Sequence, residues 1–318
     1  MHVKNISRLW VLMGLLTLVG PSVASEITPL EQAVKSVVSV MPEWPGRPPN
    51  LAEPEGSGVV TGDGTIIITA DHVLGPYAVG PDISVHIRDH DGNIVSARVI
   101  ARDKATDIAV LKIETAMQPF ADNDEALAIG DEVCAIGNAF GIGLSLTCGR
   151  VSALHRSGTG FNAIEDFIQT DAAVNPGMSG GALVDRAGRF VGMLSAIFTK
   201  QSDANIGVNL AIDRSLVIPV VSALLSEGKF SPRVSGLVFR PVPPKGEIGR
   251  EGLLVVKVRS QSPGETAGLQ EGDIVYQLDD RRVRSVAQWL ASLAIKPVGE
   301  ALITGVRDGK GMTWQLKD

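Results

Sequence analysis

The chain has 318 residues, which at about 150 residues per domain is enough for two domains. Hydrophobic residues make up 44% and charged residues 20%, so the chain can bury a core and is not wholly disordered. A net charge of −6, an aromatic content of 4% and no long Lys/Arg block argue against nucleic acid as a partner. Two cysteines are too few for a disulfide-dense scaffold or a four-thiolate zinc site.

The first 25 residues have the layout of a secretory signal peptide. Two basic residues precede an apolar run from Leu9 to Val19, and small residues follow it. The run holds 11 residues, fewer than the ~20 that span a bilayer. Cleavage after Ala24 or Ser25 is therefore favoured over a retained membrane anchor, and a tethered N-terminus is the alternative.

Export would allow Cys134 and Cys148 to form a disulfide, because oxidising compartments preserve such bonds. The two residues flank the Gly-rich stretch 137–143 at nearly equal distances, so a hairpin could place them opposite each other. Two small, separate core residues are the alternative.

The first element expected after the leader is a short helix. Thr28 to Glu31 form a capping box with Pro29 at the first helical position, and an apolar stripe runs from Leu30 to Val37. Residues 42–56 form a Pro-rich loop. From Ser57 to about Ile212, short apolar runs separated by Gly, Asn and Asp predict an all-β domain, built as one barrel or a pair.

A helix is predicted over Ser215–Glu227. Its regular part is expected to start near Pro219, because an interior proline would break it. Residues 228–234 are predicted to be a linker, which makes residues 26–227 the first domain.

Residues 235–318 are predicted to form a second, smaller domain of mixed α+β structure. Leu253–Val258 is predicted to be a strand. Ser285–Leu293 is predicted to be a helix with a Ser285/Gln288 capping box and one apolar face.

The segment 175–181, NPGMSGG, points to chemistry. Glycines on both sides of Ser179 allow a tight turn, leave its hydroxyl uncovered and can aim consecutive N–H groups into one concavity. Acyl transfer needs such a nucleophile beside donors for the developing oxyanion. A Gly-rich turn with an incidental serine is the alternative.

The same segment matches the Gly-x-Ser-x-Gly pattern of α/β-hydrolases. Those enzymes place their histidine after the serine. All five histidines of this chain precede Ser179, so the α/β-hydrolase interpretation fails.

A general base must therefore lie upstream. His72 follows a buried strand, where a rigid scaffold can hold an imidazole, although a capped strand end is the alternative. His155 lies in a polar, Gly-rich stretch and is less well placed. His86 and His90 bracket a predicted hairpin end and are interpreted as solvated. As metal ligands they would lack third and fourth partners, so neither a metal nor another cofactor is predicted.

Asp107 is the candidate for the third member of a catalytic group. It stands immediately before the apolar strand Ile108–Ile113. A carboxylate beside such a core costs several kcal/mol unless it has a partner, so a hydrogen bond to the base is expected. Bonding to local backbone N–H groups is the alternative.

The order His72, Asp107, Ser179 on an all-β chain is that of the chymotrypsin-type triad. The segments that carry these residues, TADHVL, ATDIAVLKI and NPGMSGGALVD, resemble those of the HtrA/DegP-like family of exported trypsin-like serine proteases. CAIGNAFGIG and DFIQTDAAVNPG are also similar, and the likeness runs from about residue 30 to the C-terminus. The resemblance implies a chymotrypsin-like double β-barrel, a periplasmic, ATP-independent endopeptidase for unfolded proteins, and a homotrimer.

By this resemblance Ser179 would attack the scissile carbonyl, His72 would take its proton, and Asp107 would orient the imidazole. The backbone N–H groups of Gly177 and Ser179 would form the oxyanion hole. The family usually has Asn immediately before the nucleophile, whereas this chain has Met178. The change leaves the backbone donors in place but can alter how the loop settles.

The resemblance also places the substrate pocket. Residues just upstream of the nucleophile and the strand Leu194–Ile197 would form its wall. Ala173, Val174 and Ile197 are apolar and no acid faces a basic side chain, so cleavage after small aliphatic residues is expected. Ordinary core positions for Val174 and Ile197 are the alternative.

Residues 262–275, SPGETAGLQEGDIV, resemble the PDZ signature of the same family. The resemblance implies that the second domain binds C-terminal peptides by adding them to a sheet edge. The peptide-binding loop would be Ser235, Gly236, Leu237 and Val238. An inert spacer domain is the alternative.

Three functions are compatible with these features. The leading hypothesis is a periplasmic serine endopeptidase of protein quality control, with a PDZ domain for peptide binding or regulation. Met178 motivates a second, a proteolytically weak or inactive chaperone or peptide-binding scaffold. The leader motivates a third, a membrane-tethered regulatory sensor protease.

Overall fold

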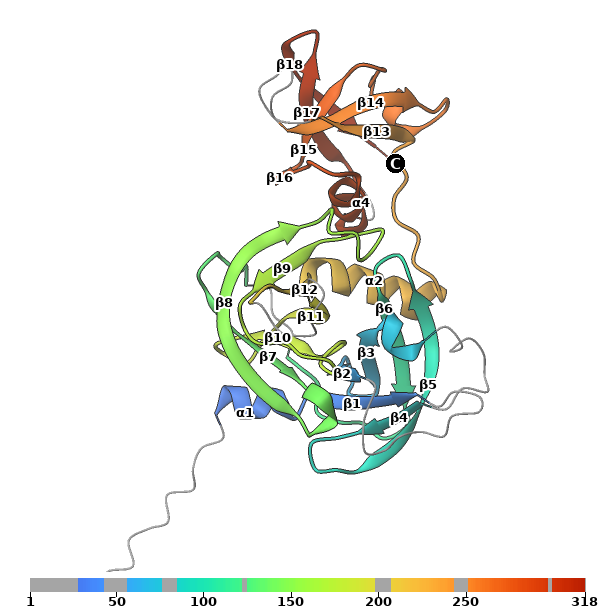
Figure 1. Ribbon diagram of the computed structural model, residues 1–318. Helices are drawn as coiled ribbons and strands as arrows, with labels where there is room; N and C mark the ends of the chain where they lie inside the picture. The colour runs from blue at the N-terminus through green and yellow to red at the C-terminus, as the bar shows by residue number, and fades with distance from the viewer. Residues whose placement is uncertain are drawn as a thin grey trace, which may run out of the picture.

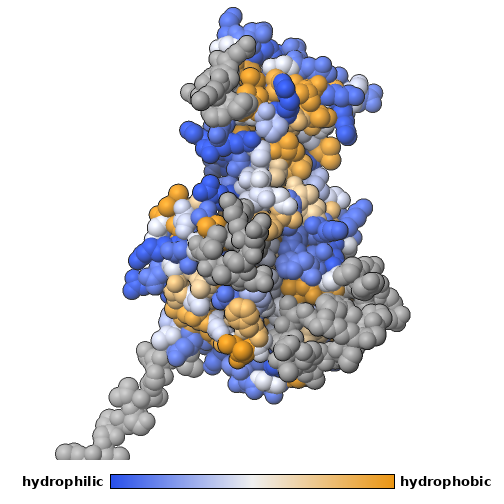
Figure 2. Space-filling view, in the orientation of Figure 1, coloured by the Kyte–Doolittle hydropathy of each residue, from blue (hydrophilic) through white to orange (hydrophobic). Residues whose placement is uncertain are grey.

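The computed structural model describes residues 28–42, 56–75, 85–121, 125–197, 207–242, 251–296 and 299–317. They form two lobes that meet at a waist (Figures 1 and 2). The larger lobe holds two closed β-barrels, and the smaller, C-terminal lobe holds one sheet with two helices. This architecture confirms the predicted fold class. The predicted signal peptide and most of the Pro-rich loop lie outside the described residues.

Six strands close the first barrel in the spatial order β1-β2-β3-β6-β5-β4. Side chains from the short apolar runs, on which the strand prediction was based, fill its interior. All five residues of β3 are buried. Its strands are β1 Val37–Pro42, β2 Gly56–Thr61, β3 Ile66–Ala70, β4 Val85–Arg88, β5 Ile94–Asp103 and β6 Ile108–Ile113, and the 3₁₀ turn η1 (Asp71–Leu74) follows β3.

The second barrel repeats this path. Read from its first strand, its order is β7-β8-β9-β12-β11-β10. The sequence has no visible internal repeat. The two barrels therefore share a strand order without sharing a sequence pattern. Its strands are β7 Glu132–Gly137, β8 Ser145–Arg156, β9 Phe167–Thr170, β10 Ala182–Asp185, β11 Phe190–Ile197 and β12 Asn209–Asp213, and the 3₁₀ turn η2 (Ala139–Gly141) follows β7.

The first helix, α1 (Pro29–Val34), has the predicted capping box. The Glu31 N–H donates to Thr28 Oγ1 at 3.2 Å, and the Thr28 N–H donates to Glu31 Oε2 at 2.7 Å. The helix is shorter than expected, because Val37 begins β1 instead of extending the stripe. Pairing of Val37 with Val59 in the fully buried barrel wall overrides the helical periodicity.

Helix α2 (Arg214–Glu227) follows β12, and the expectation that its regular part starts near Pro219 was wrong. It begins five residues earlier, where Asp213 accepts the Ser215 N–H at 2.8 Å. Leu216 and Val217 are fully buried, so capping and burial outweigh the one hydrogen bond that the proline removes. Within the described ranges, no helix has the length and apolar character needed to cross a membrane.

The C-terminal lobe is a sheet in the order β13-β14-β15-β17-β18, with β16 paired to β15. Strand β13 therefore lies at the sheet edge. Trp289, on α4, is buried in the core of this lobe and meets Phe239 of β13 edge-on at 4.8 Å. The elements are β13 Leu237–Val242, β14 Gly252–Val258, α3 Pro263–Thr266, β15 Ile274–Leu278, β16 Arg281–Arg282, α4 Val286–Ile295, β17 Ala301–Arg307 and β18 Lys310–Leu316.

Only half of the capping box expected for α4 forms. Ser285 Oγ accepts the Gln288 N–H at 3.1 Å. The Gln288 side chain does not return to the Ser285 N–H, because its oxygen accepts the Arg284 N–H and its nitrogen donates to the His155 carbonyl of the larger lobe. A contact between the lobes thus replaces the local bond.

Cys134 and Cys148 form a disulfide, which decides between the alternatives left open by the sequence. They face each other directly in the β7–β8 pair. Cys134 is fully buried in the barrel and Cys148 is exposed.

We predict that the double variant C134A/C148A unfolds at lower urea concentration than the wild type. The bridge closes a loop with a sequence separation of 14, and such a loop contributes about 3 kcal/mol. Wild-type protein in reductant is the matched control and should approach the variant's urea midpoint. An unchanged midpoint in both samples would contradict a stabilising bridge.

Candidate active site

His72 and Asp107 are brought together by neighbouring strands of the first barrel. His72 lies in η1 directly after β3, and Asp107 stands directly before β6; the pairing of Ala70 with Ile108 sets them side by side. Nδ1 of His72 lies 3.0 and 2.9 Å from the two carboxylate oxygens of Asp107, and the His72 N–H donates to Oδ1 at 3.0 Å. Nε2 is the ring nitrogen left for other chemistry.

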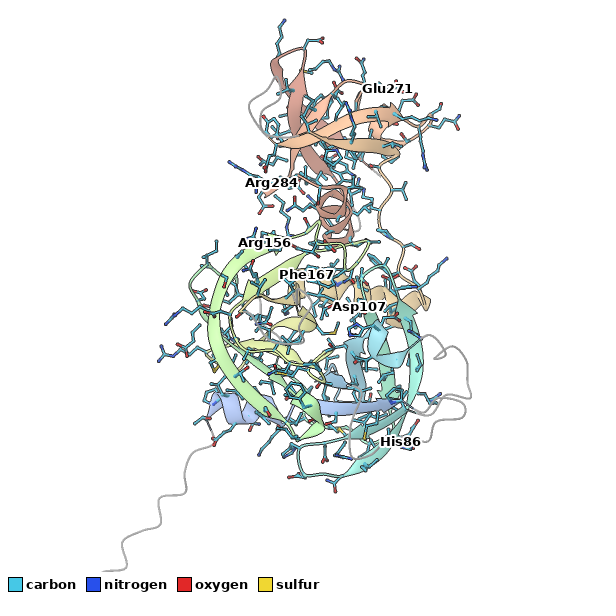
Figure 3. All side chains as sticks on the ribbon, viewed as in Figure 1. His86, Asp107, Arg156, Phe167, Glu271 and Arg284 are labelled. Atoms are coloured by element: carbon cyan, nitrogen blue, oxygen red, sulfur yellow. A yellow bond between two sulfur atoms is a disulfide. The ribbon has the colours of Figure 1, made fainter. Side chains whose placement is uncertain are left out.

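The Asp107 carboxylate also joins the two barrels. It is 7% exposed (labelled in Figure 3), and Ser195 Oγ of β11, in the second barrel, donates to Oδ2 at 2.8 Å. Its backbone has φ = 61°, and the turn before it is fixed by Asp103 Oδ2, which accepts from the Thr106 N–H and hydroxyl at 2.9 and 2.6 Å. Sequence analysis missed Ser195; a serine inside an apolar strand was the available signal.

Ser179 lies between β9 and β10, on the second barrel. Its hydroxyl donates to the Ser195 carbonyl at 3.4 Å, and its own carbonyl accepts the Ser57 N–H at 2.8 Å. Ser195 therefore touches Ser179 with its carbonyl and Asp107 with its hydroxyl. The contact with Ser195 is the only hydrogen bond of the Ser179 hydroxyl among the described residues, and none joins this hydroxyl to His72.

A tight turn over residues 175–178 shapes the loop before Ser179. The Met178 N–H donates to the Asn175 carbonyl at 3.1 Å, and Gly177 has φ = 92°. The Phe140 N–H donates to the Pro176 carbonyl at 2.7 Å, which fixes the orientation of the Pro176–Gly177 peptide. A Cβ on Gly177 would lie 2.3 Å from the Asn138 carbonyl oxygen, so only glycine fits.

Two backbone N–H groups of the loop are left without an acceptor within the described residues, those of Gly177 and Ser179. Their neighbours are all used: Met178 donates to Asn175, Gly180 to the Leu194 carbonyl at 2.7 Å, and Gly181 to the Met178 carbonyl at 2.9 Å. The free donors are the two that sequence analysis assigned to an oxyanion hole.

Met178 is accommodated by the barrel core. Its side chain is fully buried beside Val174 and Leu183, and its sulfur accepts the Asn175 N–H at 3.4 Å. The thioether thus closes the turn from the core side. The substitution leaves the loop anchored.

The residues predicted to form the substrate pocket differ in their burial. Ala173 is half-buried and its carbonyl accepts the Thr147 hydroxyl at 2.6 Å. Val174 is 2% exposed and packs in the core with Met178, the position that its alternative interpretation expected. The side chain of Ile197 lies outside the described residues.

The charges around His72 favour its protonated form. Burial of the imidazole opposes protonation, but the hydrogen bond and charge of Asp107 and the charge of Asp71 outweigh it, so the pKa of His72 is raised above 6.5. No group of three or more His, Cys, Asp or Glu side chains in the described part of the chain could hold a metal ion.

Comparison with known proteins bears on both lobes. Residues 56–193 match the trypsin-like peptidase domain, and residues 254–307 match the PDZ domain. The chain is 35% identical over 275 residues to the probable periplasmic serine endoprotease DegP-like of Rhizobium meliloti (strain 1021), covering 83% of this chain and 53% of the relative. It is 34% identical over 276 residues to the periplasmic serine endoprotease DegP of Escherichia coli (strain K12), covering 82% and 56%.

Solved structures agree with these sequence relatives. The HtrA-type protease AlgW with tripeptide superimposes with a TM-score of 0.69 at 29% identity, over 91% of this chain and 95% of the other. The chain is thus similar to HtrA-type and DegP-like serine proteases over most of its own length. The serine endoprotease from Yersinia pestis aligns with a TM-score of 0.59 at 28% identity, over the same shares. The chain spans about half the length of the curated relatives it matches.

The residues predicted to bind a peptide in the PDZ domain lead into the edge strand β13. The Ser235 carbonyl accepts the Gly264 N–H at 2.8 Å, and its hydroxyl accepts from Trp289 Nε1 at 3.3 Å. Gly236 has φ = 74°, Leu237 is half-buried and Val238 is exposed. The segment is therefore rigidly held and ends on a strand whose outer side is the sheet edge.

The PDZ domain docks on the barrels through α4, which lies between the two lobes in Figure 1. Ala291 and Ala294 are buried in the same core cluster as barrel residues and α2, with Leu290 and Ile295 packed against it. An apolar interface of this kind restrains relative domain motion.

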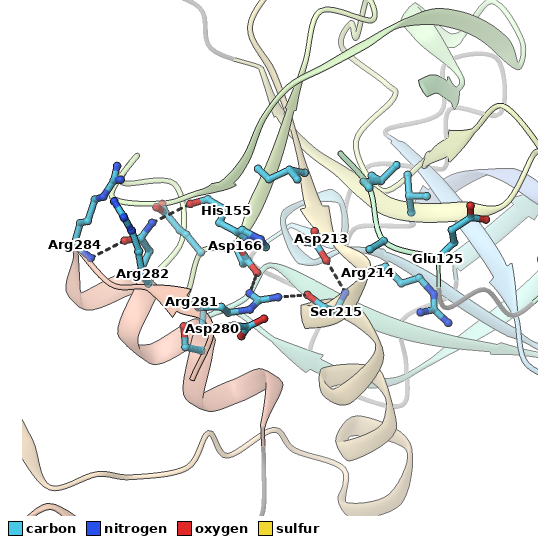
Figure 4. A pocket seen from close by; sticks show the side chains of 18 residues that line it. Glu125, His155, Asp166, Asp213, Arg214, Ser215, Asp280, Arg281, Arg282 and Arg284 are labelled. Atoms are coloured by element: carbon cyan, nitrogen blue, oxygen red, sulfur yellow. Dashed lines mark hydrogen bonds and ion pairs between the residues drawn. The ribbon is translucent and has the colours of Figure 1, made fainter. Parts of the chain in front are cut away.

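Polar contacts surround this apolar seam at a cavity of about 640 Å³ (Figure 4). Arg281 of the PDZ domain pairs with the buried Asp166 of the barrel, and its other nitrogen donates to Ser215 Oγ at 3.1 Å. His155, the rejected candidate base, lies here: its Nδ1 is 2.9 Å from the second Asp166 oxygen. Burial and the charge of Asp166 raise the pKa of the neighbouring Asp213.

The loop 157–165 runs from this interface to the turn that precedes Asp107. At one end Ser157 Oγ lies 3.0 Å from Ser285 Oγ of the PDZ domain. At the other, the Ile164 N–H donates to the Ala105 carbonyl at 2.9 Å. The buried Glu165 carboxylate accepts four hydrogen bonds from the loop. These bonds hold the loop in one conformation.

We predict that Gly177→Ala lowers the rate at which a fluorophosphonate labels Ser179 by about 10²–10³, the cost of losing one oxyanion donor. The added Cβ displaces the Pro176–Gly177 peptide. Gly143→Ala is the control, because Gly143 also has a positive φ but open space around it. Equal labelling of both variants would contradict the assignment of the Gly177 N–H.

We predict that His155→Asn removes stability at low pH. The hydrogen bond to Asp166 raises the pKa of His155 despite its burial. A raised folded-state pKa stabilises the protein below the unfolded value of 6.5 and loses this effect as the pH rises through the folded value. The urea midpoint difference between wild type and variant should therefore shrink between about pH 5 and pH 8.

Ser226→Ala, which replaces a side chain without a titratable group on the exposed side of α2, is the control. It should leave the slope of stability against pH as in the wild type. A midpoint difference for His155→Asn that stays constant across the pH range would show that the His155–Asp166 bond does not titrate.

Proposed function

We propose that this protein is a periplasmic serine endopeptidase with Ser179 as nucleophile, His72 as general base and Asp107 as the residue that orients the base. The observation that supports this most directly is the double contact of Asp107 with Nδ1 of His72, which leaves Nε2 as the proton acceptor. The names of the relatives and the signal-peptide layout of residues 1–25 support export to the periplasm.

The reaction follows from these positions. Nε2 of His72 takes the proton of the Ser179 hydroxyl as Oγ attacks the scissile carbonyl, and later returns it to the leaving amine. Asp107 stabilises the imidazolium and Ser195 holds the Asp107 carboxylate. The free N–H groups of Gly177 and Ser179 donate to the oxyanion. Water then releases the acyl group by the same steps in reverse order.

Substrates are proposed to be unfolded or misfolded exported proteins, cut after small aliphatic residues. This preference was predicted from the apolar residues Ala173, Val174 and Ile197. Of the two whose side chains are described, the half-buried Ala173 is proposed to face the substrate, because Val174 packs in the core. The PDZ domain is proposed to take C-terminal peptides along β13, at Ser235, Gly236, Leu237 and Val238, and to influence the active site through α4 and the loop 157–165. We further propose the domain division 26–227, 228–234 and 235–318, and a homotrimer as the working assembly.

The anchored loop argues against the inactive scaffold that Met178 had suggested. Buried packing and a sulfur acceptor hold the turn that carries the oxyanion donors. Fluorophosphonate labelling of the wild type separates the two functions, since a scaffold would leave Ser179 unlabelled.

We predict that Ser179→Ala lowers turnover of casein by on the order of 10⁶, as removal of such a nucleophile does in subtilisin. Binding of a C-terminal peptide to the full-length variant should persist. Ser226→Ala, a serine exposed on α2, is the matched control and should cleave casein normally. Undiminished cleavage by Ser179→Ala would remove Ser179 from its role.

A further inference from the structure

The turn that carries His72 is held by a second acidic residue, Asp71, which the triad does not use. Arg102 of β5 reaches across to it, and its Nε donates to Asp71 Oδ1 at 2.5 Å. The two side chains are only 17% and 10% exposed. Breaking a buried pair leaves an uncompensated charge and is costly.

The Arg102 guanidinium group forms hydrogen bonds with both ends of the turn η1. Beyond the carboxylate, its terminal nitrogen donates to the Asp71 carbonyl at 3.0 Å and to the Gly75 carbonyl at 3.2 Å. Asp71 is the first residue of η1 (Asp71–Leu74) and Gly75 follows its last, so one side chain holds both ends of the segment that carries His72. Only a planar, multi-donor group can make these contacts at once.

The same β5–β6 hairpin carries Arg102 and Asp107. Arg102 pairs with Ala109, two residues beyond Asp107, and the Asp71 N–H donates to the Asp107 carbonyl at 3.1 Å. His72 is therefore held from one rigid hairpin at two separate places.

We propose that Arg102 and Asp71 are positioning residues for His72: the guanidinium fixes the turn, and its charge balances the carboxylate next to the imidazole. This inference rests on the proposed function, in which His72 is the general base.

The charged groups that act on the imidazole are few. Asp107 acts from the hairpin, Asp71 from the turn itself and Arg102 through Asp71. Strands β1 and β3, which pack against η1, carry no titratable side chain. Burial lowers the pKa of His72, and the charges of Asp107 and Asp71 raise it. Asp71→Asn should therefore lower this pKa, because it removes one negative charge while Arg102 keeps its own.

Two variants separate geometry from charge. Arg102→Lys keeps the charge but cannot span Asp71 and Gly75, so casein kcat should fall about tenfold to a hundredfold, the cost of misplacing a catalytic group, with KM unchanged. Asp71→Asn keeps an acceptor for Arg102, and the acid limb of the rate of fluorophosphonate labelling against pH should move to lower pH. A merely structural role would not move that limb.

Arg98→Lys is the matched control. Arg98 lies on the same strand, and its pair with Glu114 is exposed, at 72% and 84%. This variant should keep the wild-type kcat and pH limb. Wild-type kcat in Arg102→Lys together with an unmoved limb in Asp71→Asn, in folded proteins, would overturn the proposal.

An NMR titration of the His72 imidazole tests the pair without using activity. It is done on full-length Ser179→Ala with and without Asp71→Asn, and the resonance is assigned with His72→Gln. If Asp71→Asn lowers the His72 pKa but the wild type does not cleave casein, the charge balance is upheld and the proposed protease function is refuted. An unchanged His72 pKa in a chain whose wild type cleaves casein through Ser179 would refute the charge balance alone.

Discussion

One buried carboxylate organises the active site. Asp107 accepts from the backbone and ring of His72 in the first barrel and from the Ser195 hydroxyl in the second. A carboxylate so deeply buried is tolerated only when its oxygens are satisfied, so the two barrels must meet in the register that supplies these donors. The contact between the barrels and the position of the His72 imidazole are therefore fixed by the same carboxylate.

The loop that carries Ser179, residues 175–181, is also held by hydrogen bonds, because most of its backbone groups have a partner. The Pro176, Gly177 and Ser179 carbonyls are bound by residues outside the loop, and three of its N–H groups donate to fixed carbonyls. The N–H groups of Gly177 and Ser179 have no hydrogen-bond acceptor in the part of the chain that the structure describes. The buried thioether of Met178 closes the turn from the core side, where its sulfur accepts the Asn175 N–H.

The PDZ domain is part of the same packed body. Its helix α4 shares a hydrophobic core with the barrels, and Arg281 enters the charged cavity beside Asp166. The loop 157–165 connects that interface to the turn before Asp107. A continuous set of contacts thus connects the C-terminal lobe with the turn that precedes Asp107.

The sequence determined what depends on local patterning. Four features could be predicted: the Thr28–Glu31 capping box, the strand Ile108–Ile113, the mixed second domain and the order of His72, Asp107 and Ser179. Each is encoded by residues near one another or by order alone. The tertiary structure decided what depends on distant neighbours. Burial drew Val37 into β1 and started α2 before Pro219, and strand register joined Cys134 to Cys148. Packing of one barrel against the other brought Ser195 to Asp107, and the strand order β3-β6-β5 brought Arg102 to Asp71. Residues 88 and 31 positions apart leave no periodic signal in the sequence.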